Sequence, residues 1–164
     1  MSRGFVKEDD QEEVPMVPPR AHLPPGVTNY VTPSGMEELQ AERQSLLAEI
    51  AQLDGSNEKE RRIALNHLNA RISLLDERIS SARVIRPEDL PGDEVRFGSV
   101  VTMRIGNKTQ VFQIVGVDEA NISKGKIAFT SPVAKVLNNR RVGERVVLKR
   151  PSGDAAFEIL DIGA

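Results

Sequence analysis

The chain has 164 residues, with 22 Lys and Arg side chains against 24 Asp and Glu, so its formal net charge is −2. The absence of cysteine excludes disulfides, thiolate zinc sites and cysteine nucleophiles, and the two isolated histidines, His22 and His67, do not make a multi-histidine metal centre. No run approaches the roughly 18 apolar residues of a membrane span, and the N-terminus lacks a secretory apolar region. We therefore expect a cytoplasmic protein, outside any membrane and without a cofactor of its own.

Residues 1–33 hold six of the ten prolines, and an acidic cluster (Glu8, Asp9, Asp10, Glu12, Glu13) precedes all six. Proline fixes φ and removes an amide donor, so neither helix nor sheet propagates easily there. Few apolar groups are available to offset the entropy lost on ordering. The composition predicts an extended, disordered tail.

Residues 34–85 carry the clearest apolar period in the chain. Steps of three and four residues connect two sets of positions: Met36, Leu39, Arg43, Leu46, Ile50 and Leu53, then Leu65, Leu68, Ile72, Leu75, Ile79 and Ala82. This spacing is typical of a coiled-coil seam. The break at 54–58 joins a helix-ending glycine, Gly55, to Asn57, which has Glu60 three residues later as a capping partner. Leu39 with Leu75 and Leu46 with Leu68 share a midpoint at position 57, which favours one antiparallel hairpin over a parallel dimer.

The chain changes character after a linker at 86–94, which contains Pro87 and Pro91. Residues 95–164 show short β-like runs at 99–105, 109–115, 126–129, 145–149 and 156–161. Ser131 and Pro132 begin a short helix that extends to about residue 138. We predict an α+β protein of two modules, with the helical hairpin followed by a small antiparallel sheet covering one short helix.

Charge is divided unevenly between the two modules. Residues 95–164 carry 11 basic and 6 acidic side chains, and residues 1–94 carry 11 basic and 18 acidic ones. The densest basic group, a candidate phosphate-attracting patch, consists of Arg140, Arg141, Arg145, Lys149 and Arg150. Because no aromatic residue is interleaved with it, base stacking is not indicated, and a solvated charged face explains it as well.

Catalytic signatures are sparse, and we assign no intrinsic catalytic residue. The sequence contains no glycine-rich phosphate loop, nucleophile elbow or metal-spaced histidine motif. Asp54, Glu58 and Glu60 crowd carboxylates around the predicted hairpin turn, where two of them would help to complete the oxygen shell of a Mg²⁺ ion. Helix capping and the helix dipole explain the same residues without a metal.

The C-terminal module contains an ordered set of short motifs at 95–98, 114–116, Glu119-Ala120, 125–127, Ser131-Pro132 with Ala134, and 142–144. In these motifs it resembles the C-terminal domain of the GreA/GreB family of bacterial transcription factors. The opening Thr32-Pro33-Ser34-Gly35 and the closing segments 71–72 and 82–85 of the hairpin are also similar, so that the resemblance covers roughly residues 29–163.

This resemblance implies an FKBP-like C-terminal domain that docks beside the secondary channel of RNA polymerase, while the coiled coil enters the channel. The implied docking segment is Thr130, Ser131, Pro132 and Val133, and contact with the DNA and RNA of the elongation complex is indirect. In family members that stimulate transcript cleavage, tip carboxylates help to hold a Mg²⁺ ion shared with the polymerase active site. Asp54 and Glu58 are the nearest candidates here.

Two departures separate this chain from the cleavage factors. The usual tip pattern Asp-x-x-Glu-Asn is replaced by Asp54-Gly55-Ser56-Asn57-Glu58, and the hairpin is about two turns per arm shorter, about 10 Å of reach. The regulator of nucleoside diphosphate kinase, which resembles the family, also has a short coil. We therefore expect an accessory factor that binds polymerase and regulates elongation. The alternatives are cleavage stimulation and, in another class, a peptidyl-prolyl isomerase-like protein or other protein-binding adaptor.

Overall fold

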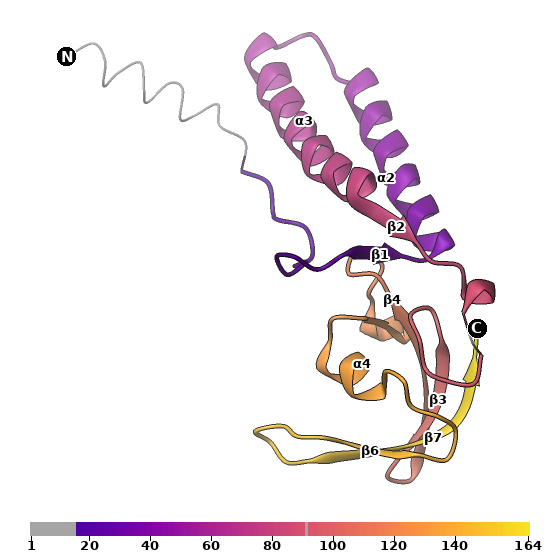
Figure 1. Cartoon of the computed structure of the whole chain (residues 1–164). Helices are drawn as coiled ribbons and strands as arrows, with labels where there is room; N and C mark the ends of the chain where they lie inside the picture. The colour runs from indigo at the N-terminus through magenta and orange to yellow at the C-terminus, as the bar shows by residue number, and fades with distance from the viewer. Residues whose placement is uncertain (1–15, 91) are drawn as a thin grey trace. The chain divides into compact units, whose positions relative to one another are not determined.

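The structure is a computed structural model that describes residues 16–90 and 92–164. Its elements in chain order (Figure 1) are β1 (Asn29–Val31), α2 (Pro33–Ala51), α3 (Glu58–Ser81), β2 (Ala82–Val84), the 3-10 helix η1 (Pro87–Asp89), β3 (Val100–Ile105), β4 (Lys108–Val115), the 3-10 helix η2 (Ile122–Lys124), β5 (Lys126–Ala128), α4 (Pro132–Leu137), β6 (Arg145–Leu148) and β7 (Ala155–Gly163). Two compact units divide the described residues: 16–20 with 39–80, and 21–38 with 81–90 and 92–164. The protein is α+β, as predicted. None of the helices in the described ranges has the length and apolarity to span a membrane.

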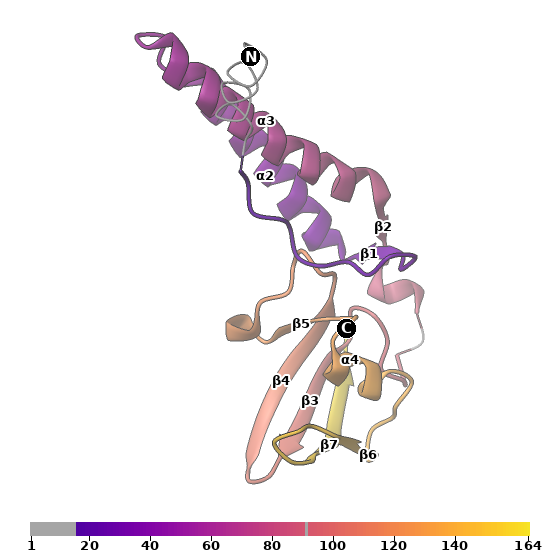
Figure 2. The same ribbon diagram turned by 90° about the vertical axis from the view of Figure 1, so that its left-hand side faces the viewer.

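Helices α2 and α3 run antiparallel, side by side (Figures 1 and 2). Leu39, Leu46, Leu68 and Leu75, the two leucine pairs predicted from the sequence, are all buried. Arg43 on α2 donates from Nε to Asp76 Oδ1 on α3 at 2.7 Å, and this hydrogen bond raises the pKa of Arg43. The leucines supply the apolar seam, whereas knobs-into-holes packing of a coiled coil stays a prediction.

The turn between α2 and α3 is closed by polar side chains. Asn57 Oδ1 accepts a hydrogen bond from the Glu60 amide at 3.2 Å, which confirms Asn57 as the residue that caps α3. The role predicted for Gly55 was wrong, because α2 ends at Ala51 and Gly55 is not left-handed. Asp54, which binds Ser56, shapes this turn instead.

Two boundaries differ from the prediction at the base of the hairpin. Residues 29–33, assigned to a disordered tail, form β1 and the start of α2, while the part of that assignment at 1–15 lies outside the described residues. Residues 82–84, expected to continue the helical seam, form β2, which pairs in parallel with β1. Each strand satisfies the other's backbone groups, a long-range pairing that local propensity does not reveal.

The larger sheet has the order β5-β4-β3-β7-β6. Strands β3, β4, β6 and β7 pair antiparallel, as predicted, but β5 pairs in parallel with β4, so the sheet is mixed and the prediction of a purely antiparallel sheet was wrong. The cause is the connection at 116–125, which is long enough to return the chain in the same direction, as a two-residue hairpin turn is not.

One face of this sheet is covered by α4 (Figure 2). Ala134 and Leu137 of α4 pack in a buried cluster with Val101, Met103 and Ile159 of the sheet. The Ser131 side chain accepts the Ala134 amide at 3.3 Å, and Pro132 follows as the first helical residue, so the predicted start of this helix is confirmed.

The hairpin offers a matched pair of truncations. Leu46 is 2% exposed and its neighbour Leu47 is 38% exposed. We expect Leu46→Ala to lower the free energy of unfolding by about 2–5 kcal/mol, because it leaves a cavity in the seam. Leu47→Ala should change it by about 0.5 kcal/mol or less. Denaturant titration followed by far-UV circular dichroism measures both, and equal losses would contradict the buried seam.

Candidate functional site

The Asp54 carboxylate at the tip of the hairpin is held within its own turn. Its Oδ1 accepts the Ser56 amide at 3.0 Å and its Oδ2 accepts the Ser56 hydroxyl at 2.8 Å. These hydrogen bonds, that from the Ser56 side chain first, lower the pKa of Asp54. The carboxylate is therefore kept ionised and oriented by the turn.

Glu58, the other candidate metal ligand, lies exposed in the first turn of α3. Over residues 16–90 and 92–164, no group of three or more His, Asp or Glu side chains is placed to hold a metal ion. Each Asp54 oxygen keeps a further lone pair, so the side chain is chemically able to join an oxygen shell completed by another molecule. A role for Asp54 and Glu58 as ligands of a shared Mg²⁺ ion stays a prediction.

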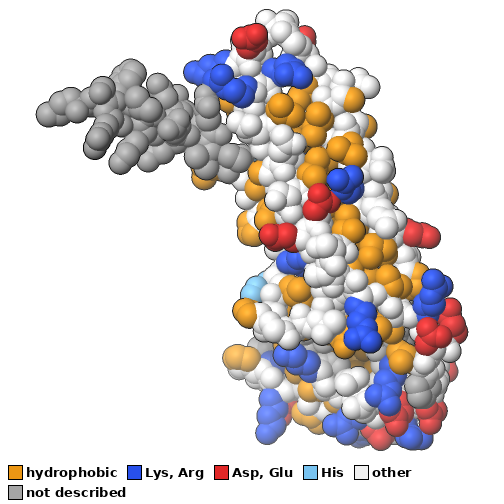
Figure 3. Space-filling model, turned by 45° about the horizontal axis from the view of Figure 1, so that its top comes forward, with side chains coloured by type: hydrophobic (Ala, Val, Ile, Leu, Met, Phe, Trp, Pro, Cys, Tyr) orange, Lys and Arg blue, Asp and Glu red, His pale blue; other side chains and the backbone are white. Residues whose placement is uncertain are grey.

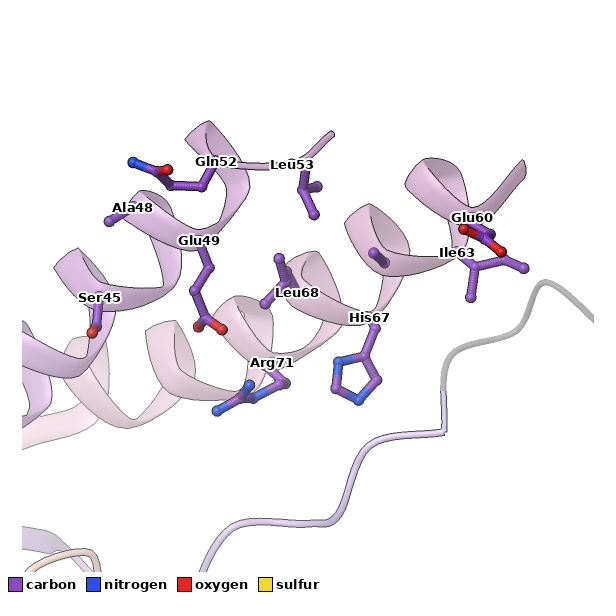
Figure 4. A pocket seen from close by; sticks show the side chains of 11 residues that line it. Ser45, Ala48, Glu49, Gln52, Leu53, Glu60, Ile63, His67, Leu68 and Arg71 are labelled. Atoms are coloured by element: carbon purple, nitrogen blue, oxygen red, sulfur yellow. The ribbon is translucent and has the colours of Figure 1, made fainter. Parts of the chain in front are cut away.

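A groove of about 850 Å³ lies on the hairpin between α2 and α3 (Figure 4). Its lining combines apolar and polar groups: Ser45, Ala48, Glu49, Gln52, Leu53, Glu60, Ile63, Ala64, His67, Leu68 and Arg71. Figure 3 shows hydrophobic side chains gathered along the hairpin and Lys and Arg side chains near its tip. From the sequence, His67 was only excluded from a multi-histidine metal centre, and the groove was not predicted. The sequence feature that could have indicated the groove is Ile63, a large apolar residue within a polar stretch. In the structure Ile63 is 41% exposed.

The implied docking segment lies at the start of α4. Pro132 is exposed, whereas Thr130, Ser131 and Val133 are half-buried. Val133 packs against the core of the sheet, and Ser131 is engaged as the helix cap. Only part of the segment is therefore available to a partner, chiefly Pro132.

The predicted basic group is partly neutralised by carboxylates. Arg141 contacts Asp93 and Glu94 at 3.0 and 2.9 Å, and Arg140 lies 3.7 Å from Glu144. Arg150 donates from Nε to the Gly153 carbonyl at 3.2 Å. Arg145 and Lys149 are exposed on and just after β6, and they remain the two members of the group best placed to attract phosphate.

The structure also brings together a polar cluster that sequence reasoning did not identify. The buried Glu119 carboxylate accepts hydrogen bonds from Thr32 Oγ1 at 2.5 Å, from Ser34 Oγ at 3.2 Å and from Lys126 Nζ at 3.4 Å. Thr32 Oγ1 in turn accepts the Gly35 amide at 2.9 Å. A Cβ at Gly35 would lie 2.7 Å from Glu119 Oε2, so the cluster has no room for a side chain there. The motifs Thr32-Pro33-Ser34-Gly35 and Glu119-Ala120 were both visible in the sequence. Nothing in the sequence indicated that their side chains contact each other.

Comparison with known proteins decides the family. The family model "Transcription elongation factor, GreA/GreB, C-term" matches residues 90–164. The GreA transcription elongation factor of Acidiphilium cryptum is 39% identical over 118 residues, which is 71% of this chain and 72% of the relative. The chain belongs to the GreA/GreB family. The GreA of Syntrophotalea carbinolica is 35% identical over the same shares of both chains.

Solved structures of this family give a weaker match. GreA factor homolog 1 (Gfh1) of Thermus thermophilus is 23% identical and aligns with a TM-score of 0.40 over 84% of this chain and 100% of that one. A GreA/GreB factor from Nitrosomonas europaea is 18% identical, with a TM-score of 0.41 over 82% and 98%. The family membership of this GreA/GreB protein rests on its sequence relatives.

Aromatic residues of the C-terminal module pack against other aromatic rings inside the fold. Phe97 and Phe129 lie 5.6 Å apart, and Tyr30 of β1 packs on them at 5.9 and 5.6 Å between ring centroids. A cavity beside Phe97, lined also by Pro87, Leu90 and Ile162, has a volume of only 120 Å³. Ligand pockets usually measure about 300–1,000 Å³, so this cavity offers no support for the peptidyl-prolyl isomerase alternative.

The pKa of Asp54 provides a test of the tip. Because the pKa is lowered in the folded turn, its contribution to stability is complete above the ordinary Asp pKa and is lost as pH falls through the lowered value. We expect Ser56→Ala to raise the pKa of Asp54 toward its ordinary value, as measured by carbon-detected NMR titration of the carboxyl group. An unchanged pKa in Ser56→Ala would contradict the proposed cause.

The Glu119 cluster provides a second test. Glu119→Ala would leave the Thr32 and Ser34 hydroxyls and the Lys126 ammonium without this buried acceptor. We expect the variant to lose about 1–3 kcal/mol of unfolding free energy. Glu119→Gln, which keeps a carbonyl acceptor, should lose less. Chemical denaturation monitored by Tyr30 fluorescence compares the three proteins, and an Ala variant as stable as wild type would refute the role of the cluster.

Proposed function

We propose that this protein binds RNA polymerase and regulates transcription elongation by placing its helical hairpin at the entrance of the secondary channel. Membership of a family of transcription elongation factors supports a role in transcription elongation. A protein with this partner works in the cytoplasm and reaches the DNA and RNA of the elongation complex indirectly, through the polymerase.

The observation that carries the proposal is the hairpin itself. Helix α2 has 19 residues and α3 has 24, and at 1.5 Å per residue they extend for about 28 and 36 Å. Buried leucines and the Arg43–Asp76 pair fasten one helix to the other, so that the tip is carried on a supported pair of helices. Such an element suits insertion into a narrow opening because little conformational entropy is lost on entry.

The C-terminal unit supplies the second contact in this proposal, through the start of α4. Exposed Pro132 is the part of the docking segment that a partner can reach without disturbing the core. Two contacts on one chain raise the effective concentration of each, so a modest interface at α4 assists the hairpin.

Stimulation of transcript cleavage is the competing mechanism, favoured by the ionised and oriented Asp54 carboxylate at the tip. In that mechanism Asp54 and Glu58 would donate oxygens to a Mg²⁺ ion held by the polymerase, and the ion would activate the attacking water. The chain's own residues would supply ligand oxygens for the metal, but would not supply the catalyst.

An assay of RNA extension and RNA shortening in backtracked elongation complexes of purified RNA polymerase distinguishes the two mechanisms. For elongation regulation, we expect the protein to change the rate of RNA extension without faster RNA shortening, and Asp54→Ala and Glu58→Ala to behave like wild type. Faster shortening that either substitution abolishes would establish cleavage stimulation instead.

Docking through α4 has its own test. Pro132→Glu puts a negative charge at a helix N-terminus, where the helix dipole tolerates it, so folding should be preserved. We expect its affinity for polymerase to fall several-fold, whereas Lys108→Glu at the exposed start of β4 should bind as wild type does. Fluorescence anisotropy with labelled protein measures both affinities, and equal binding by the two variants would place the docking surface elsewhere.

A further inference from the structure

The groove on the hairpin presents accessible side chains from both helices. On α3 it is lined at steps of three and four residues by Glu60, Ile63, Ala64, His67, Leu68 and Arg71, and on α2 by Ser45, Ala48, Glu49, Gln52 and Leu53. Ile63 is 41% exposed and Ala48 is also exposed, so apolar and small groups are open to a partner. Lining at this spacing on two antiparallel helices makes a face on which further helices can pack.

The lining is symmetric about one level of the hairpin. On α3, positions 60 and 71, 63 and 68, and 64 and 67 all average 65.5. On α2, positions 45 and 52, and 48 and 49, average 48.5. The midpoint of 48.5 and 65.5 is 57, which is also the midpoint of the buried pairs Leu39 with Leu75 and Leu46 with Leu68. The two centres therefore lie side by side on the paired helices.

The two ends of this face on α3 carry opposite charges. Glu60 lies at the end near the tip, and Arg71 lies at the other end (Figure 4). Among the described residues, neither side chain is engaged in an ion pair. An interface between two copies related by a two-fold axis uses the same patch on both, so the patch must complement itself. A two-fold axis across the helices at the level of 65.5 places Glu60 of each copy opposite Arg71 of the other.

We propose that the groove is the contact surface for a second copy of this chain, with the two hairpins antiparallel and their groove faces together in a four-helix bundle. Near the axis, Ile63 of each copy packs against Leu68 of the other. The small Ala48 and Ala64 lie beside them and let the helices approach closely. At both ends of the contact, Glu60 and Arg71 form ion pairs between the copies.

The size of the contact predicts a weak dimer. Asn57 of one copy lies opposite Leu74 of the other, so the overlap stays within residues 39–80 of the hairpin unit and extends for about 26 Å. Two adjacent helices are about 20 Å wide, which gives about 500 Å² per copy, less than the about 800 Å² of a standard interface. Glu49 of the two copies also approach each other near the axis, and this repulsion weakens the contact. We expect a reversible dimer with a dissociation constant of about 10–100 μM.

Dimer formation would cover the helices that act in the proposed function. If the hairpin enters the polymerase channel as a single copy, the dimer and the polymerase-bound protein exclude each other, and the dimer is a reserve that dilution or polymerase releases. This consequence rests on the proposed function, whereas the contact between the two copies does not.

Sedimentation velocity of the full-length protein tests the contact. At concentrations below and above the expected dissociation constant, the weight-average sedimentation coefficient should rise from that of a monomer toward that of a dimer. Ile63→Asp places a charge at the centre of the interface and should leave the protein monomeric. Leu47→Asp changes a similarly exposed residue that does not line the groove, and it should dimerise as wild type does.

A charge exchange tests the antiparallel arrangement. Arg71→Glu and Glu60→Arg each replace two ion pairs by two like-charge contacts, so each should raise the dissociation constant about tenfold. The double variant restores opposite charges at both ends and should dimerise nearly as well as wild type. Circular dichroism checks that every variant keeps its helices.

Three outcomes would overturn the proposal. The first is a wild-type protein that stays monomeric at every concentration, since the groove would then serve some other partner. The second is equal dimer formation by the Ile63→Asp and Leu47→Asp proteins. The third is a charge-exchanged double variant that dimerises no better than the single variants. None of these measurements involves polymerase, so failure of the dimer is distinguishable from failure of the proposed function.

Discussion

The buried carboxylate of Glu119 is the contact on which the start of the helical hairpin depends. The Thr32 hydroxyl donates its only proton to Glu119, which leaves an oxygen lone pair to accept the Gly35 amide in the first turn of α2. A carboxylate at a helix N-terminus is stabilised by the helix dipole and by unpaired amides, and Lys126 adds an opposite charge. The hydrogen bonds of Glu119 therefore join the segment 32–35 to residues more than eighty positions later in the chain.

Backbone proximity reinforces this arrangement. A Cβ at Gly116 would lie 2.5 Å from the Tyr30 carbonyl, so the approach of β1 requires glycine at that position. Tyr30 then packs its ring on Phe97 and Phe129. Hydrogen bonding, steric fit and aromatic packing all act on residues 29–35 within the sheet-bearing unit. The predicted tail therefore contains part of the core of that unit, which explains the wrong assignment of its last residues.

The candidate functional groups are different residues from those that stabilise each unit. Among the described residues, buried leucines and ion pairs such as Arg43–Asp76 stabilise the hairpin, whereas the exposed tip carries Asp54 and Glu58. Exposed side chains contribute little to folding, so chemistry at the tip can vary while the helices persist. The same separation holds at α4, where Val133 packs inward and Pro132 faces outward.

The sequence by itself determined the elements whose signals are local. The period of three and four identified the leucine seam, Asn57 and Ser131 identified the helix starts, and alternating runs identified most strands. Contacts between distant segments were decided only by the tertiary structure, namely the parallel pairing of β1 with β2, the parallel addition of β5, the groove beside Ile63 and the meeting of Thr32 with Glu119. The physical reason is that capping and amphipathic spacing act within a few residues, whereas strand partners and buried ion pairs are chosen by which surfaces the folded chain brings within reach.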